Sequence, residues 1–198
     1  MNKTPDIYIS ISDFFSDEYI ESVNKDLRTD NLGLVVETTK RGAGFASPEW
    51  VIPSLIGVYI LKSYFDGFLK EAGKHHFSLL KNWLTTNTEI LKPITTKTVS
   101  SEGSTNKIDP NNTQSKTFSI HTIILDGVTL KFLFDDNLSI EQWQTSSISA
   151  LNLLADYFEN KNDNELETML TLAKPQGNML FMVINPITLE WEFRPLFS

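Results

Sequence analysis

Hydrophobic positions near the start of the chain change from a strand-like to a helix-like spacing and back. Residues 7–11 alternate apolar and polar side chains, which is the pattern of a strand with one buried face. Ser16 can cap a helix, and apolar residues recur at helical spacing from there to Arg28. The apolar run 34–36 predicts a second, more buried strand. Strand, helix and strand in this order predict a βαβ unit.

The segment 50–69 has an apolar first half, broken by a proline, and a second half with one polar face. Because it is apolar nearly all round before it becomes amphipathic, we predict a buried core helix here. Gly73 is predicted to end this helix, and an apolar stripe predicts another between residues 77 and 91. A membrane-active or partner-binding helix over 50–69 is the alternative, which Lys62 and Asp66 within the span disfavour.

Turn signals organise the middle of the chain. Residues 94–99 resemble a strand, and residues 100–116, almost devoid of apolar side chains, predict a mobile surface loop. The dipeptide Asp126–Gly127 separates the apolar runs 118–125 and 128–134. Because a type I′ turn needs positive φ at both central positions, this dipeptide predicts a β-hairpin.

A helix pair and two strands are predicted after the hairpin. Ser139 and Gln142 form a capping box, which opens a helix with apolar residues along one side. A shorter helix is predicted around residues 166–170, and strands are predicted over 179–184 and 188–193.

These elements predict an α+β (mixed α/β) fold. An N-terminal βαβαα lobe over residues 1–92 precedes a β-hairpin/helix/β-hairpin lobe over residues 93–198, with one mixed or antiparallel sheet packed by helices. No linker is long enough to separate independent units, so residues 1–198 are interpreted as a single domain with two lobes.

Composition and charge narrow the classes of function. The chain contains no cysteine, which excludes disulfides, thiolate metal sites and a cysteine nucleophile. A formal net charge of -8 disfavours sequence-independent binding to nucleic acid and adsorption to an anionic membrane. The chain opens without the basic and apolar segments of a secretory signal, so we expect a cytoplasmic protein without stable membrane insertion.

A glycine-rich loop is the most suggestive feature of the first half. Lys40, Arg41, Gly42 and Gly44 lie between a predicted strand end and a predicted helix start at Ser47, where backbone N–H groups favour an anion. The spacing matches neither the dinucleotide fingerprint nor the P-loop, and such a loop is usually only a connection. A phosphate- or nucleotide-binding site here is therefore an alternative hypothesis.

Aromatic residues alternate near the end of the chain. Trp191, Phe193 and Phe197 fall on a common side of the last predicted strand, as far as Pro195 permits. They either anchor the core or, if exposed on an edge strand, form a surface for a protein partner or for self-association.

No catalytic residue, metal or cofactor is predicted. His75 and His76 would point about 100° apart on a helix, and His121 is alone in a strand, so the histidines offer no shared metal face. Asp126 is explained by its turn, and residues 135–136 by the loop before a helix. The hydrolase elbow and the zinc-binding helix motif are absent from the sequence.

Residues 6–10, the helix after them and residues 32–37 resemble the start of a TIR domain, over less than a quarter of the chain. In enzymes of that family the catalytic glutamate follows a serine and an aromatic residue in a later helix. Residues 47–50 hold these residue types in a different order, so the resemblance carries over no functional residue.

The first hypothesis is a non-enzymatic protein-interaction or regulatory module, because the special residues are used in caps, turns and core. The second is an enzyme or sensor for a small phosphorylated ligand, using the loop from Lys40 to Gly44. The third is a membrane-active effector that acts through residues 50–69.

Overall fold

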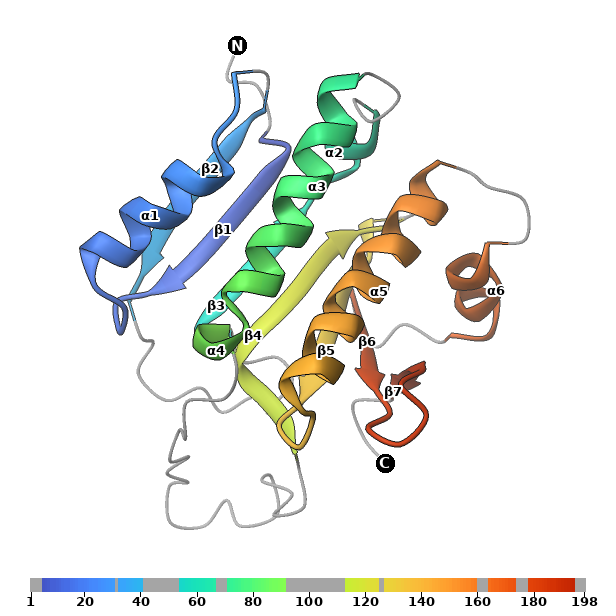
Figure 1. Ribbon diagram of the computed structural model, residues 1–198. Helices are drawn as coiled ribbons and strands as arrows, with labels where there is room; N and C mark the ends of the chain where they lie inside the picture. Colours follow the sequence, from blue (N-terminus) through green and yellow to red (C-terminus); the bar gives the residue numbers. More distant parts are fainter. Residues whose placement is uncertain are drawn as a thin grey trace.

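The computed structural model describes residues 5–30, 32–40, 54–66, 71–91, 113–124, 127–159, 164–173 and 178–194. Within these residues, seven strands form one mixed sheet in the order β2-β1-β3-β4-β5-β6-β7. The six helices of these residues lie on one face of the sheet (Figure 1). The predicted α+β class is confirmed, and the sheet is of the mixed kind.

Parallel and antiparallel pairs alternate across the sheet. The strands are β1 (Ile7–Ser12), β2 (Leu34–Thr39), β3 (Ile56–Ile60), β4 (Gln114–Ile123), β5 (Thr129–Asp135), β6 (Met179–Ile184) and β7 (Trp191–Arg194). The parallel pairs are β1/β2, β3/β4 and β5/β6, and the antiparallel pairs are β1/β3, β4/β5 and β6/β7. Since parallel neighbours need a crossover, each parallel pair has at least one helix between its strands in sequence.

Capping residues set the starts of three helices. The helices are α1 (Asp17–Leu27), α2 (Lys62–Asp66), α3 (Glu71–Thr86), α4 (Thr88–Leu91), α5 (Ile140–Phe158) and α6 (Glu165–Leu172). Ser16 caps α1, Asn164 caps α6, and Ser139 with Gln142 forms the predicted capping box of α5. The predicted β1-α1-β2 unit and the β4–β5 hairpin are confirmed, and Gly127 has a φ of 74° in that turn.

The predicted core helix over residues 50–69 is wrong in its described part. Residues Ile56–Ile60 are a strand, β3, which pairs with β1 on one side and β4 on the other. The physical reason is that a short apolar run buried on both faces of a sheet has no periodicity to separate it from a buried helix. Only α2, from Lys62 to Asp66, is helical in this segment. None of the described helices combines the length and the apolarity needed to cross a bilayer.

Three smaller expectations also differ. Gly73 lies within α3 instead of ending a helix. β4 begins at Gln114, inside the loop predicted over residues 100–116, whose earlier part lies outside the described residues together with 94–99. β2 is half-buried because it is an edge strand with one neighbour in the sheet.

One apolar layer between sheet and helices forms the core. Alternate residues of the strands face the helices, and the central ones are fully buried: Ile7, Ile9, Ile11, Ile56, Val58, Ile60, Phe118, Ile120, Leu130, Phe132 and Phe134. The helices contribute buried leucines and two tryptophans, Trp83 of α3 and Trp143 of α5. Trp143 stacks on Phe134 with ring centroids 4.4 Å apart, which fixes α5 against the centre of the sheet.

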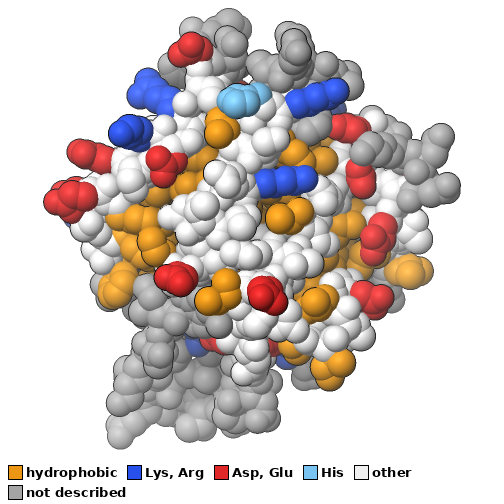
Figure 2. Space-filling model, viewed as in Figure 1, with side chains coloured by type: hydrophobic (Ala, Val, Ile, Leu, Met, Phe, Trp, Pro, Cys, Tyr) orange, Lys and Arg blue, Asp and Glu red, His pale blue; other side chains and the backbone are white. Residues whose placement is uncertain are grey.

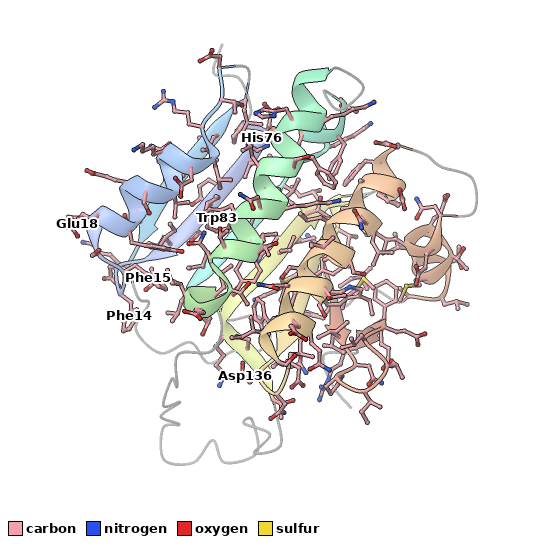
Figure 3. All side chains as sticks on the ribbon, in the orientation of Figure 1. Phe14, Phe15, Glu18, His76, Trp83 and Asp136 are labelled. Carbon is pink, nitrogen blue, oxygen red and sulfur yellow. The ribbon has the colours of Figure 1, made fainter. Side chains whose placement is uncertain are left out.

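His76 ties three helices together at one end of this layer, where Figure 3 shows it near the end of α1. Its Nε2–H donates to the Leu27 carbonyl at 2.9 Å, so its Nδ1 accepts from the Tyr64 hydroxyl at 3.0 Å. Burial lowers the pKa of His76 below its ordinary value, because the charged ring would lose its hydration.

Replacing His76 by leucine should lower the free energy of unfolding at pH 8 by about 1–3 kcal/mol, because two buried polar partners lose their hydrogen bonds. The pKa of His76 is lower in the folded than in the unfolded protein, so wild type loses stability as pH falls below 6.5 toward the folded pKa. The difference in the free energy of unfolding between wild type and His76→Leu, measured by urea unfolding, should therefore become smaller as pH falls below 6.5. The exposed neighbour gives a matched control, His75→Gln, and equal pH dependence of wild type and His76→Leu would contradict the assignment.

Candidate functional site

The sheet face away from the helices carries a cluster of polar side chains. Residues that pair across neighbouring strands share a face, so the strand register assigns each side chain to one side. The face without described helices holds Tyr8, Ser10, Glu37, Thr39, Gly57, Tyr59, Ser119, His121, Lys131, Leu133, Phe181 and Val183. The helix side, seen in Figure 2, instead has charged residues scattered between separate hydrophobic patches.

Two adjacent rows of paired residues cross this face. The first row runs through Tyr8, Tyr59, His121, Lys131 and Phe181, each in register with the next. The second row lies one step along the strands and consists of Ser10, Gly57, Ser119, Leu133 and Val183. The polar residues of the two rows lie on β1, β3 and β4 and, at Lys131, on β5. Beside them, Leu133 of β5 forms a small buried cluster with Phe181 and Val183 of β6.

The centre of the rows is tightly connected. The Tyr59 ring stacks on the His121 ring, with centroids 4.2 Å apart and planes at 18°. The Ser119 Oγ lies 2.7 Å from His121 Nε2, a hydrogen bond in which either atom can be the donor. Tyr8 meets the Tyr59 ring edge-on at 5.4 Å, and its hydroxyl donates to Glu37 Oε2 at 3.1 Å.

Gly57 makes room for this arrangement. A Cβ at this position would lie 3.1 Å from Tyr59 Cε2 and 3.7 Å from His121 Nε2. The first distance is tighter than ordinary van der Waals contact, so a larger residue would press on the stacked rings. The absence of a side chain at Gly57 therefore lets Tyr59 and His121 lie over the middle of the sheet.

Burial increases along the first row. Tyr8 and Tyr59 are half-buried, whereas His121 is 4% exposed and Lys131 is 2% exposed. A lysine so deeply buried is unusual, because an ammonium group loses its hydration there. The row therefore leads from a partly exposed pair of phenols to a desolvated amine.

Burial and charge set the protonation of this cluster. Burial, and then the nearby charge of Lys131, hold the pKa of His121 well below its ordinary value. Burial lowers the pKa of Lys131 to about 8. At neutral pH the imidazole is therefore uncharged, while most of the Lys131 amine is still protonated. Burial also raises the pKa of Tyr59, so its phenol keeps its proton.

A second polar cluster, where β5 leads into α5, is explained by structure. Asp135 accepts hydrogen bonds from the Thr113 hydroxyl, from the Asn137 backbone N–H at 2.8 Å and from Asn137 Nδ2 at 3.0 Å. Figure 3 labels the next residue, Asp136, beside the start of α5. These bonds close the turn before the helix. The described residues contain no group of three side chains that could hold a metal ion.

The sequence-predicted anion loop lies almost wholly outside the described residues. Lys40 follows the last residue of β2 and is exposed. Arg41, Gly42, Gly44 and Ser47 lie outside the described residues, so phosphate binding there stays a prediction.

Of the two alternatives for the C-terminal aromatic residues, the structure places Trp191 in the core. This side chain is 4% exposed and meets the rings of Phe132 and Phe134 edge-on at 5.0 and 5.3 Å. Phe193 is half-buried against the same core, and Phe197 lies outside the described residues. Trp191 therefore anchors β7 to the core, because the inner face of this edge strand points toward the helices.

Sequence reasoning missed the central residues of the cluster. No local pattern identifies Ser119, Tyr59 or Lys131 as a site residue, and His121 is isolated in the sequence. One signal was available, since Lys131 stands at the middle of the apolar strand 129–135, where a charged residue interrupts the hydrophobic run.

Replacing Lys131 by methionine should raise the free energy of unfolding at pH 7 by about 1–3 kcal/mol. A pKa of about 8, against an ordinary 10.5, corresponds to about 3 kcal/mol of cost for keeping the ammonium in the folded protein. Wild type regains this stability as pH rises from about 8 to 10.5, where the unfolded chain binds more protons, so the gain should shrink there. Urea unfolding at pH 7 and near pH 10 measures the difference in the free energy of unfolding. A variant that is less stable than wild type at pH 7 would show that Lys131 has a structural role.

Comparison of the chain with protein-family models, with curated proteins and with solved structures finds no match. The functional interpretation of this protein therefore depends on its own residues and their arrangement.

Proposed function

We propose that the protein binds a small anionic molecule on the sheet face that lacks described helices, at Lys131, His121, Ser119 and Tyr59. The observation that carries the proposal is the placement of a lysine, a neutral histidine and a serine in two adjacent rows of one sheet face. An apolar residue in place of the lysine would pack in the same space without the cost of desolvation. A bound anion would form a charge-assisted hydrogen bond with the ammonium, in addition to the contacts that Lys131 has within the protein.

The neighbours of Lys131 suit an anion. With the Ser119–His121 hydrogen bond in place, either the imidazole N–H or the Ser119 O–H remains to donate to an oxyanion, and neither group adds negative charge. The stacked Tyr59 ring holds the imidazole in one orientation. A carboxylate or a phosphate suits these residues, because its negative charge complements the ammonium and its oxygens accept hydrogen bonds.

The structure favours anion binding over a second possibility, acyl transfer in which Ser119 is the nucleophile and His121 the base. A general base must take a proton during the reaction, and its pKa should lie near the working pH. Burial and the charge of Lys131 make the imidazolium of His121 unfavourable, so this ring is a poor base for activating Ser119. The pair is better suited to donating hydrogen bonds than to nucleophilic attack.

An anion that pairs with the Lys131 ammonium should bind best below pH 8. Above about pH 8 its affinity should fall by about tenfold per pH unit, because the amine loses the proton that the anion needs. Titration calorimetry with acetate and with inorganic phosphate measures the affinity and separates the two ligand classes.

The matched variants for this experiment are Lys131→Met and Lys81→Met. Lys81 lies on α3, donates to Asn152 Oδ1 at 2.8 Å and sits over the Phe77 ring, on the helix side of the sheet. Its replacement should leave the affinity unchanged, whereas Lys131→Met should abolish binding. Equal affinity of wild type and Lys131→Met would remove the proposal.

Contact with another copy of this chain is a second candidate function. It is favoured by two large apolar side chains that are almost wholly exposed, Leu172 at the end of α6 (83%) and Ile187 between β6 and β7 (89%). Sedimentation should then show a mass that increases with concentration in wild type and stays monomeric in Leu172→Ser with Ile187→Ser. A wild-type protein that is monomeric at every concentration would count against it.

A further inference from the structure

A short helix is held in place by a histidine that can change its charge. α2 (Lys62–Asp66) has five residues, and a helix of this length is not stable by itself. Its position therefore depends on contacts with other elements. The Tyr64 hydroxyl donates to His76 Nδ1 on α3 at 3.0 Å, and the Phe65 ring stacks on Phe158 of α5, with ring centroids 4.9 Å apart.

His76 is joined to two helices through both of its ring nitrogens. Its Nε2–H donates to the carbonyl of Leu27, the last residue of α1, at 2.9 Å, which leaves Nδ1 as the acceptor for Tyr64. The His76 side chain is 2% exposed and the Tyr64 side chain is 4% exposed. Bulk water therefore does not reach these two hydrogen bonds while the junction of the three helices is closed.

We propose that His76 is a pH-sensitive switch: in acid it takes up a proton, and α2 moves away from α3 and α5 while the central sheet stays folded. The proton adds to Nδ1, so the ring then directs an N–H toward the Tyr64 oxygen. The hydroxyl must turn its own hydrogen away and loses its acceptor, and the new charge is buried. Both costs disappear when α2 moves aside and water reaches the ring.

The groups around His76 set the pH range of this change. Burial is the main reason why the pKa of His76 is below its ordinary value, and the charge of His75 on the same helix lowers it further. The hydrogen bond to the Leu27 carbonyl and the charge of Asp6, before β1, act in the opposite direction. Tyr64 of α2 is in direct contact, and burial raises its pKa, so it stays neutral. The open form is therefore favoured as the pH falls below 6.5.

Opening changes the surface at this end of the helix layer. Tyr64 and Phe65 are 4% and 3% exposed in the closed form, and their rings meet edge-on at 5.2 Å. Moving α2 aside brings both rings, and the Phe158 ring that stacks on Phe65, into contact with solvent. The acid form thus presents an apolar surface that the neutral form hides.

Amide hydrogen exchange of the full chain, measured residue by residue by NMR, tests the switch. The Tyr64 N–H donates to the Leu61 carbonyl at 3.0 Å, so its protection factor reports on α2. We expect this factor to be lower than that of Leu151, in the middle of α5, at every pH, because α2 opens without global unfolding. It should also fall by about tenfold per pH unit below 6.5, until the pH reaches the pKa of His76 in the folded protein.

Variants separate the switch from general instability in acid. His76→Gln keeps a donor for Leu27 and an acceptor for Tyr64 but does not titrate, so its Tyr64 protection factor should be the same from about pH 7.5 to about pH 5. His75→Gln, at the exposed neighbour, should keep the loss of protection in acid.

Three results would overturn the proposal. The first is equal protection of Tyr64 and Leu151 in wild type at every pH, which would mean that α2 opens only with the whole protein. The second is a Tyr64 protection factor in wild type that does not change with pH, and the third is a pH dependence that persists in His76→Gln. The two wild-type measurements decide alone if His76→Gln fails to fold.

Discussion

The alternation of side chains along each strand is the constraint on which the rest of this structure depends. Every strand must place its residues in turn on two faces, and the crossovers between parallel neighbours put all the described helices on one of them. That side becomes the apolar core, in which Phe134 stacks on Trp143 and Trp191 closes the edge. The other side receives the alternate residues without a described helical layer above them. The polar residues of this face are thereby separated from the apolar core, although Ser119, His121 and Lys131 are buried as well.

The division of the faces explains how a buried lysine is tolerated. The core side is continuous from Ile9 through Val58 and Ile120 to Phe132, which are residues of four neighbouring strands. Burying one such side chain contributes about 2 kcal/mol, so the layer as a whole outweighs the cost of about 3 kcal/mol at Lys131. Because Lys131 and Phe132 point to opposite sides of the same strand, stability and the polar cluster are separated by one residue step.

Local signals predicted the elements of this fold, and long-range pairing decided the rest. The Ser139–Gln142 box and the hairpin turn at Gly127 act within a few residues, so the sequence carries them in full. The sequence predicts a helix where β3 lies, because a short apolar segment looks the same in a central strand as in a core helix. The polar cluster could not be predicted either, because it depends on pairing between strands that are distant in sequence. Tyr59 meets His121 only because β3 pairs with β4 across a long insertion, and no local pattern encodes that register.

Electrostatic coupling makes the central residues act as one unit instead of separate groups. Burial, and then the charge of Lys131, lower the pKa of His121, so the ring stays neutral and its hydrogen bond with Ser119 does not require an acid partner. An anion beside the amine would oppose burial at both groups, raising both pKa values and stabilising the ammonium. Proton uptake and anion binding would then be linked, since each favours the other. The Ser119–His121 pair, which resembles a hydrolytic dyad in its distances, would by this coupling serve instead to orient donors around a charged amine.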